Sequence, residues 1–276
     1  MRGHWISLLL STGCATAGSS WISEPLSGDD AEEWSEVYSR PMNAAPPNTS
    51  RRPPPPRQPS ARTLSELPPL ERPAVQPNAK LEGKVLGKFR NTYYDFPSET
   101  DYSGNEVPLM NATCRPIKNV PKEFHDRVCV QGSGMLASGS TVSFNRRDCE
   151  CASVCPRTNQ RICFDELDKQ RFPWGRGATG GAITPLLSVA VDSDVVPLGT
   201  PIYIPEYDGL ARDAAQSSYH DGCFIAQDRG LKVKGKHVDV FTGHESVTKL
   251  WNRLVPSNEG VTVVLESPRC ARATTP

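Results

Sequence analysis

The sequence carries no net charge and no long apolar run. Its 31 Lys and Arg residues balance 31 Asp and Glu residues over 276 positions. A domain that binds nucleic acid normally shows a basic excess, so this balance argues against nucleic acid as a partner. No stretch reaches the roughly 18–20 apolar residues that a membrane-spanning helix needs. Uncharged ligands such as sugars remain compatible with the composition.

The sequence also lacks the short motifs of several enzyme classes. It contains no G-x-S-x-G elbow, no P-loop, no H-E-x-x-H and no dinucleotide-binding fingerprint. The glycine-rich stretch "GSGMLASG" (132–139) is not followed by a helical pattern, so we interpret it as a turn rather than a phosphate-binding loop. We therefore predict no cofactor and no metal.

The N-terminal part differs in composition from a folded domain. Twelve of the 26 prolines lie between residues 41 and 77, and such a segment cannot bury enough apolar surface to form a core. Residues 1–14, "MRGHWISLLLSTGC", combine a basic residue, a short apolar run and small residues before Cys14, as signal peptides do. The ending "LSTGC" resembles a bacterial lipobox; a chance cysteine is the alternative. We predict a signal peptide over 1–14, a disordered tether over 15–82 and a folded unit over 83–276.

These features together predict an exported lipoprotein of the bacterial cell envelope. A lipid on Cys14 would anchor the chain to a membrane, at the periplasmic face of the outer membrane, and the tether would let the folded unit reach a nearby partner. We expect the folded unit to be monomeric.

Eight cysteines remain if Cys14 carries lipid. An even number in an exported domain is typical of disulfides, here four. The close spacing in "CECASVCPRTNQRICF" (149–164) is also compatible with a zinc site, but the stretch lacks paired C-x-x-C knuckles and contains no histidine. The pairing does not follow from the sequence, although adjacent cysteines are too close to bond each other easily, so some bridges should leave the cluster. The eight are Cys114, Cys129, Cys149, Cys151, Cys155, Cys163, Cys223 and Cys270.

Short strands separated by turns dominate the sequence after residue 83 and predict a mainly β fold, a sandwich or a barrel. Only "HESVTKLWNRL" (244–254) has the apolar spacing of a helix. Residues 97–184, with six of the eight cysteines, are expected to form a loop-rich insertion stapled by disulfides. The expected strands are "GKVLGKFRNTYYDF" (83–96), "STVSF" (140–144), "LLSVAVD" (186–192), "VVPLGTPIYIP" (195–205), "GCFIAQD" (222–228), "KHVDVF" (236–241) and "GVTVVLE" (260–266).

Three aspartates stand at strand ends or between valines. Asp192 ends "LLSVAVD", Asp228 ends "GCFIAQD", and Asp239 lies between two valines in "KHVDVF". Burial at such places can raise the pKa of a carboxyl group, as a general acid for a glycosidic oxygen requires. Each aspartate taken alone is also compatible with a turn cap or a surface position. Asp228 and Asp239 are expected on the two strands of one hairpin, with Lys234 and Gly235 in the turn.

Two segments resemble a known family in residue order and spacing. "AVDSDVVPLGTPIYIP" (190–205) and "AQDRGLKVKGKHVDVFTG" (226–243) are similar to the 3D domain, named for three aspartates and found in membrane-bound lytic murein transglycosylase A. The resemblance implies a six-stranded double-psi β-barrel. The chain departs from the family pattern at Arg229 and Leu231, in an extra loop "EYDGLARDAAQSSYH" (206–220) and in the insertion 97–184. The matching residues are Asp192, Pro197, Leu198, Gly199, Thr200, Tyr203, Pro205, Ala226, Asp228, Gly230, Gly235, Asp239 and Phe241.

The resemblance further implies a lytic transglycosylase that acts on peptidoglycan glycan strands. Such an enzyme cleaves the β-1,4 bond between N-acetylmuramic acid and N-acetylglucosamine and leaves a 1,6-anhydro sugar. The implied acid and base is Asp239, supported by Asp228 and Asp192. The candidate substrate-binding residues are Thr92, Tyr93, Trp174, Lys234 and His237. For Tyr93 and Trp174, packing within the protein is the alternative role.

Two other functions remain compatible with the sequence. One is a non-catalytic module that binds cell-wall polysaccharide. The other is a polysaccharide hydrolase with Asp228 and Asp239 as its acid and base.

Overall fold

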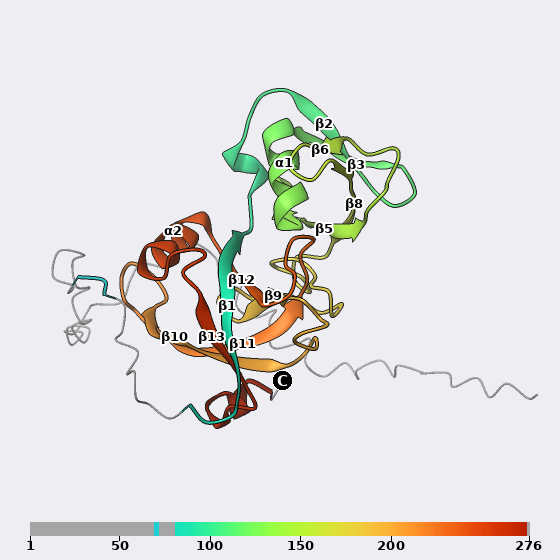
Figure 1. The fold of residues 1–276 in the computed structure, drawn as a ribbon. Coiled ribbons are helices and arrows are strands. Elements are labelled where there is room, and N and C mark those ends of the chain that lie inside the picture. The colour runs from blue at the N-terminus through green and yellow to red at the C-terminus, as the bar shows by residue number, and fades with distance from the viewer. Residues whose placement is uncertain (1–68, 72–80, 275–276) are drawn as a thin grey trace, which may run out of the picture. The chain divides into compact units, whose positions relative to one another are not determined.

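The computed structural model describes residues 69–71 and 81–274 of the chain (Figure 1). Cys14, the predicted lipobox cysteine, and most of the predicted tether over 15–82 lie outside the described residues. Leu70, within that range, packs against the core of the barrel. Over the part of the chain that the structure describes, none of the helices is long and apolar enough to cross a membrane.

Six strands close into a barrel, which confirms the predicted mainly β fold and the six-stranded barrel (Figure 1). Their order around the barrel is β1-β12-β9-β11-β10-β13. Two of the pairings, β1 with β12 and β9 with β11, are parallel, and the others are antiparallel. The strands are β1 (Lys84–Asp95), β9 (Ser188–Val191), β10 (Pro201–Ala211), β11 (Tyr219–Asp228), β12 (His237–Gly243) and β13 (Val261–Leu265).

The barrel interior is filled by side chains that alternate along the strands. Val238 and Val240 of β12 are fully buried among them, as are Phe224 and Ala226 of β11. Because successive residues of a strand point to opposite faces, the residue between each pair projects outward. Asp239 therefore projects from the outer face of the barrel.

The segment that carries Asp228 and Asp239 is not a hairpin, which corrects the prediction. Strand β9 lies between β11 and β12, parallel to the first and antiparallel to the second. All four residues of β9 are buried, and an apolar strand of this kind needs neighbours on both edges to satisfy its backbone. Proximity in the sequence suggested that β11 and β12 pair directly, but the longer-range pairing prevails.

The expected extra loop over 206–220 is mostly strand, which is a second correction. β10 runs on to Ala211 and β11 begins at Tyr219, so that a turn remains only between them. Tyr207 and Leu210 are fully buried in the barrel core. These two apolar side chains explain why the segment extends the β10–β11 pair.

The predicted helix is confirmed as α2 (Glu245–Leu254). Leu250 and Trp251 form its buried face, and the Trp251 indole nitrogen donates a hydrogen bond to the Ala211 carbonyl at 3.1 Å. The indole therefore joins the helix to the end of β10.

The insertion over 97–184 has short strands and a hydrophobic core of its own, so it is more ordered than the predicted loop-rich segment. Phe124, Val128 and Phe164 are fully buried in this core. Its elements are η2 (Glu99–Asp101), β2 (Glu106–Met110), β3 (Pro116–Pro121), α1 (Lys122–Gln131), β4 (Ser133–Met135), β5 (Thr141–Arg146), β6 (Val154–Cys155), β7 (Gln160–Arg161) and β8 (Cys163–Leu167); a 3-10 segment, η3 (Pro268–Thr274), ends the described chain.

Helix α1 was not predicted from the sequence. Its ten residues, "KEFHDRVCVQ", are mostly polar, and only Phe124 and Val128 give it the spacing of an apolar helix face. A disulfide from Cys129 links it to a distant segment, and a left-handed Gly132 (φ 84°) ends it. A short apolar pattern is a weak signal, and packing against the insertion core decides the conformation.

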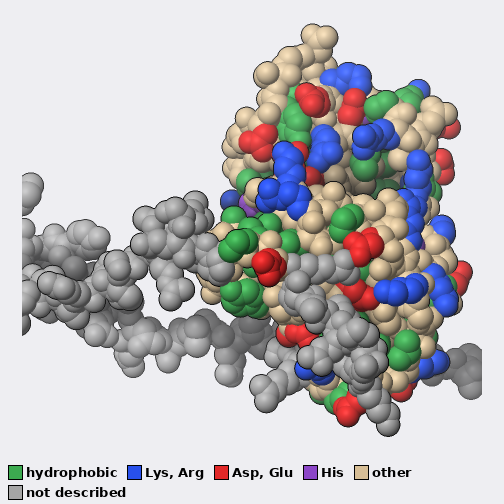
Figure 2. Space-filling view, turned by 60° about the vertical axis from the view of Figure 1, so that its left-hand side comes forward, with side chains coloured by type: hydrophobic (Ala, Val, Ile, Leu, Met, Phe, Trp, Pro, Cys, Tyr) green, Lys and Arg blue, Asp and Glu red, His purple; other side chains and the backbone are tan. Residues whose placement is uncertain are grey.

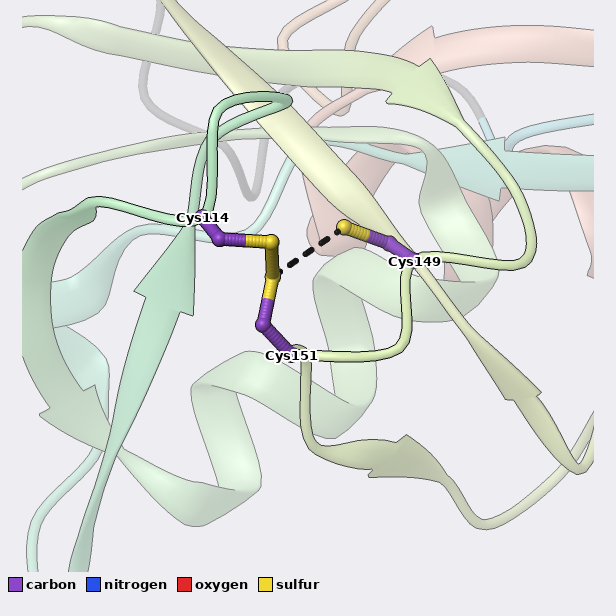
Figure 3. Close-up of side chains that lie close together, drawn as sticks. All are labelled: Cys114, Cys149 and Cys151. Carbon is purple, nitrogen blue, oxygen red and sulfur yellow. Dashed lines mark hydrogen bonds between the residues drawn. A yellow bond between two sulfur atoms is a disulfide. The ribbon is translucent and has the colours of Figure 1, made fainter.

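All eight cysteines of the described chain are paired in four disulfides. The bridges are Cys114–Cys151, Cys129–Cys155, Cys149–Cys163 and Cys223–Cys270. Two bridges leave the 149–163 cluster, as expected, and one closes within it. Figure 3 shows Cys149 beside the Cys114–Cys151 bridge, with its sulfur 3.6 Å from that of Cys151.

Acidic and basic side chains are interspersed on the face of the molecule in Figure 2. Several of them pair, for example Lys88 with Glu206 at 2.7 Å and Lys118 with Glu99 at 2.5 Å. The presence of both signs on this face agrees with their equal totals in the sequence.

Candidate active site

Strands β1 and β12 bring the first pair of polar residues together on the outer face of the barrel. They run parallel, with Thr92 directly opposite Asp239. The Thr92 hydroxyl lies 2.6 Å from Asp239 Oδ1 and 2.8 Å from His237 Nε2. His237 and Asp239 therefore project from the same face, as their spacing of two residues predicted.

The carboxyl group of Asp239 is a much weaker acid than an exposed aspartate. Burial raises the pKa of Asp239 to about 6, from an ordinary value of 3.8. A hydrogen bond that the Thr92 hydroxyl donates to the ionised carboxylate lowers this pKa, as does Arg90, and the neighbouring carboxylate of Asp228 raises it. The result is a carboxyl group that keeps its proton at mildly acidic pH, where a general acid is useful.

Asp228, at the end of β11, lies close enough to interact with Asp239 and is held by three donors. Its Oδ1 accepts hydrogen bonds from the backbone of Arg229 at 2.8 Å and of Ala178 at 3.2 Å. Its Oδ2 accepts one from the Tyr94 hydroxyl at 3.1 Å. Burial raises the pKa of Asp228, and these donors oppose the rise.

The segment around Ala178 reaches Asp228 because a glycine precedes it. A Cβ atom at Gly177 would lie 2.5 Å from the carbonyl oxygen of Gln227, which is too close for any other residue. The same segment is tied to β11 by the Thr179 amide, which donates to Gln227 O at 3.2 Å. The insertion thus ends in a loop that covers Asp228.

Tyr94 was missed in the sequence, and the expected place of Tyr93 needs correction. Tyr93 points to the opposite face of β1, where its hydroxyl donates to Val255 O at 2.6 Å and lies 3.1 Å from the Tyr207 hydroxyl. Tyr94 shares the face of Thr92, and its hydroxyl is the one that contacts Asp228. Strict alternation along β1 could have identified Tyr94, because it lies two residues after Thr92.

Asp192 contacts the turn that precedes β12, with Lys234 nearby. The Asp192 carboxylate accepts hydrogen bonds from the backbone of Gly235 at 2.7 Å and Asp194 at 3.3 Å. The Gly235 amide, with a smaller effect from Lys234, lowers the pKa of Asp192. In this position Asp192 holds the start of β12, which carries Asp239.

Trp174 lies in an aromatic cluster at the other end of the same face. Its ring centroid is 5.4 Å from Phe96, 6.2 Å from Phe241 and 5.0 Å from His244. It also lines a cavity of about 640 Å³ between β1 and α1, where Asp95 accepts two hydrogen bonds from Arg127. A cavity of this size with an aromatic wall suits a small ligand.

The described residues include two groups close enough to share a metal ion. They are Cys114, Cys149 and Cys151, and His125, Cys129 and Cys155. Every cysteine in both groups is in a disulfide, and only a thiolate binds a metal well.

The segment that carries this geometry matches a known family. Residues 187–253 match the family model described as the 3D domain. This chain carries a 3D domain. The 3D domain extends from β9 to α2 and includes Asp192, Asp228 and Asp239. No curated protein matches the chain.

Solved structures similar to this 3D domain protein include three lytic transglycosylases. MltA from E. coli with bound chitohexaose has 16% sequence identity and a TM-score of 0.44, over 66% of this chain and 72% of that one. The membrane-bound lytic murein transglycosylase from Agrobacterium tumefaciens has 14% identity and a TM-score of 0.43, over 68% and 76%. MltA from Neisseria gonorrhoeae has 17% identity and a TM-score of 0.37, over 54% and 46%. Likeness at this level says nothing of activity.

Proposed function

We propose that the protein is a lytic transglycosylase that cleaves the β-1,4 bond between N-acetylmuramic acid and N-acetylglucosamine in peptidoglycan. The observation that carries the proposal is Asp239: a carboxyl group on the outer face of a 3D domain, with its pKa raised to about 6 by burial. Asp228 beside it strengthens the rise. Export and a lipid anchor on Cys14 would place the enzyme at the cell wall.

Asp239 acts first as an acid in this proposal. Its protonated carboxyl group donates to the glycosidic oxygen while the bond from that oxygen to C1 of the muramic acid breaks. The leaving sugar departs with the proton, and positive charge develops on the muramic acid ring. The Asp228 carboxylate, held by Tyr94, Ala178 and Arg229, would stabilise that charge.

Asp239 then acts as a base. Its carboxylate accepts the proton of the C6 hydroxyl, and the C6 oxygen bonds to C1 to close the 1,6-anhydro ring. No water enters, so the two products together have the composition of the substrate. One carboxyl group serves both steps, whereas most glycosidases use two in separate roles.

The test is to incubate the full chain with purified peptidoglycan sacculi and to analyse the soluble products by mass spectrometry. The expected product is a muropeptide that carries an anhydro sugar and has one water less than a hydrolysis product. Asp239→Asn should release none and still sediment with sacculi. Asp221→Asn changes an exposed carboxylate elsewhere on β11 and should be as active as the unaltered protein.

Other outcomes would identify the alternatives. Products with a reducing end would indicate a hydrolase. Sedimentation of the unaltered protein with sacculi, without any soluble product, would indicate a wall-binding module and refute the proposal.

A further inference from the structure

The Thr92 hydroxyl lies between two groups that compete for its single proton. It is 2.6 Å from Asp239 Oδ1 and 2.8 Å from His237 Nε2. A hydroxyl donates one hydrogen bond and can accept others. If the Thr92 hydroxyl donates to His237, it can only accept a hydrogen bond from Asp239. Asp239 can donate that bond only when its carboxyl group is protonated.

The other nitrogen of His237 indicates which arrangement holds. His237 Nδ1 lies 3.3 Å from the carbonyl oxygen of Lys232. A carbonyl oxygen can only accept, so this contact requires a proton on Nδ1. In the neutral ring, Nε2 then has a lone pair and accepts from Thr92. The resulting chain runs from Asp239 to Thr92, to His237 and to Lys232 O, with each group donating to the next.

We propose that His237 is a positioning residue that turns the Thr92 hydroxyl away from Asp239 and thereby favours the protonated form of Asp239. The inference rests on the proposed function in one respect, because it concerns the acid of that reaction. His237 need not touch the substrate, since it acts through Thr92.

The remaining charged and titratable groups around the pair agree with this arrangement. Arg90 from β1 faces both residues, while Asp228 from β11 faces Asp239, as does the buried Tyr94 hydroxyl from β1. Burial and then Arg90 lower the pKa of His237, so the ring is neutral at neutral pH. A neutral ring has a lone pair on one nitrogen, as the proposed chain needs.

The arrangement gives Thr92 a part in each proton transfer. When Asp239 gives its proton to the glycosidic oxygen, the Thr92 hydroxyl can rotate and donate to the new carboxylate, at the loss of its hydrogen bond to Nε2. When Asp239 takes the proton of the C6 hydroxyl, Thr92 turns back to His237. Thr92 keeps its own proton throughout, so the proton balance between Asp239 and the sugar is unchanged.

The test measures the pKa of Asp239 directly, in the full chain labelled with carbon-13 at aspartate carboxyl groups, by NMR titration. His237→Phe frees Thr92 to donate to the carboxylate without losing another hydrogen bond. It should lower the pKa of Asp239 by about 1, a roughly tenfold change in its ionisation constant and the size of one ordinary hydrogen bond. His237→Leu should do the same and replaces the Phe variant if that one does not fold.

A second background separates the proposed role from a general effect of His237 on the site. In a Thr92→Val background, His237→Phe should leave the pKa of Asp239 unchanged, because the connecting hydroxyl is gone. His244→Phe, an exposed histidine beside Trp174, should leave it unchanged in the unaltered background.

Two results would overturn the inference: no fall in the pKa of Asp239 on His237→Phe, or the same fall in the Thr92→Val background. Neither measurement requires activity, so failure of the inference is distinct from failure of the proposed function. In an active enzyme, the pH at which activity declines on the alkaline side should move down by the same amount.

Discussion

Replacing Asp239 with Asn should make the folded protein more stable at neutral pH. The folded state holds this carboxyl group with a pKa of about 6, against the ordinary value of 3.8 for an exposed aspartate. Each pKa unit corresponds to about 1.4 kcal/mol, so ionised Asp239 costs the folded state up to about 3 kcal/mol. Asn cannot ionise, and its side-chain oxygen can still face the Thr92 hydroxyl.

The sign of the pH dependence follows from proton counts. Between pH 3.8 and about 6 the folded state binds more protons at this site than the unfolded state, so the free energy of unfolding falls as the pH rises. The fall is complete above about pH 6. The free energy of unfolding of Asp239→Asn should therefore exceed that of the unaltered protein by about 3 kcal/mol near pH 7.5, and by less than about 1 kcal/mol near pH 4.

The assay is urea unfolding of both proteins at the two pH values, followed by tryptophan fluorescence with the disulfides intact. Groups distant from Asp239 titrate alike in both proteins and cancel in the difference. Asp192→Asn is the matched control with the opposite sign: the Gly235 amide lowers the pKa of Asp192, so that variant should lose stability at pH 7.5 relative to pH 4. A gain for Asp239→Asn that is equal at both pH values would refute the reasoning.

Two further predictions concern stability away from the site. Burial lowers the pKa of His220 to about 4 from 6.5, so this group should lower the free energy of unfolding by about 3 kcal/mol as the pH falls from 7 to 4. Urea unfolding at both pH values should show that His220→Phe lacks this decrease, and an equal decrease in the variant would contradict the assignment. The Cys223–Cys270 bridge joins residues 47 apart, so changing both cysteines to Ser should lower the free energy of unfolding by about 4 kcal/mol through the chain entropy of the unfolded state. Urea unfolding under oxidising conditions measures this change, and a decrease below about 1 kcal/mol would exclude chain entropy as the origin.

Local patterns were sufficient to place most of the barrel strands and the helix α2. Alternation of apolar residues marks β1 and β12, and the continuous apolar run "LLSVAVD" marks β9. These signals are local because a strand or an amphipathic helix shows its buried face in its own residues. The spacing of Asp228 and Asp239 in the sequence was likewise sufficient to identify both as candidate site residues.

The pairings between distant segments could not be predicted from the sequence. Nothing local indicates that β9 separates β11 from β12, that Cys129 bonds to Cys155, or that the mostly polar segment of α1 is a helix. Each depends on which surfaces meet once the chain is closed, and the free energy of that choice is spread over many contacts.

The sequence by itself determined the mainly β class, the 3D pattern and the three aspartates. Only the tertiary structure decided their different surroundings: Asp239 and Asp228 are half-buried and close enough to interact, whereas the Asp192 carboxylate accepts a hydrogen bond from the Gly235 amide. It also brought Thr92 of β1 between His237 and Asp239 of β12. The physical reason is that a carboxyl pKa depends on burial and on groups that are neighbours in space, and these come from strands far apart in the chain.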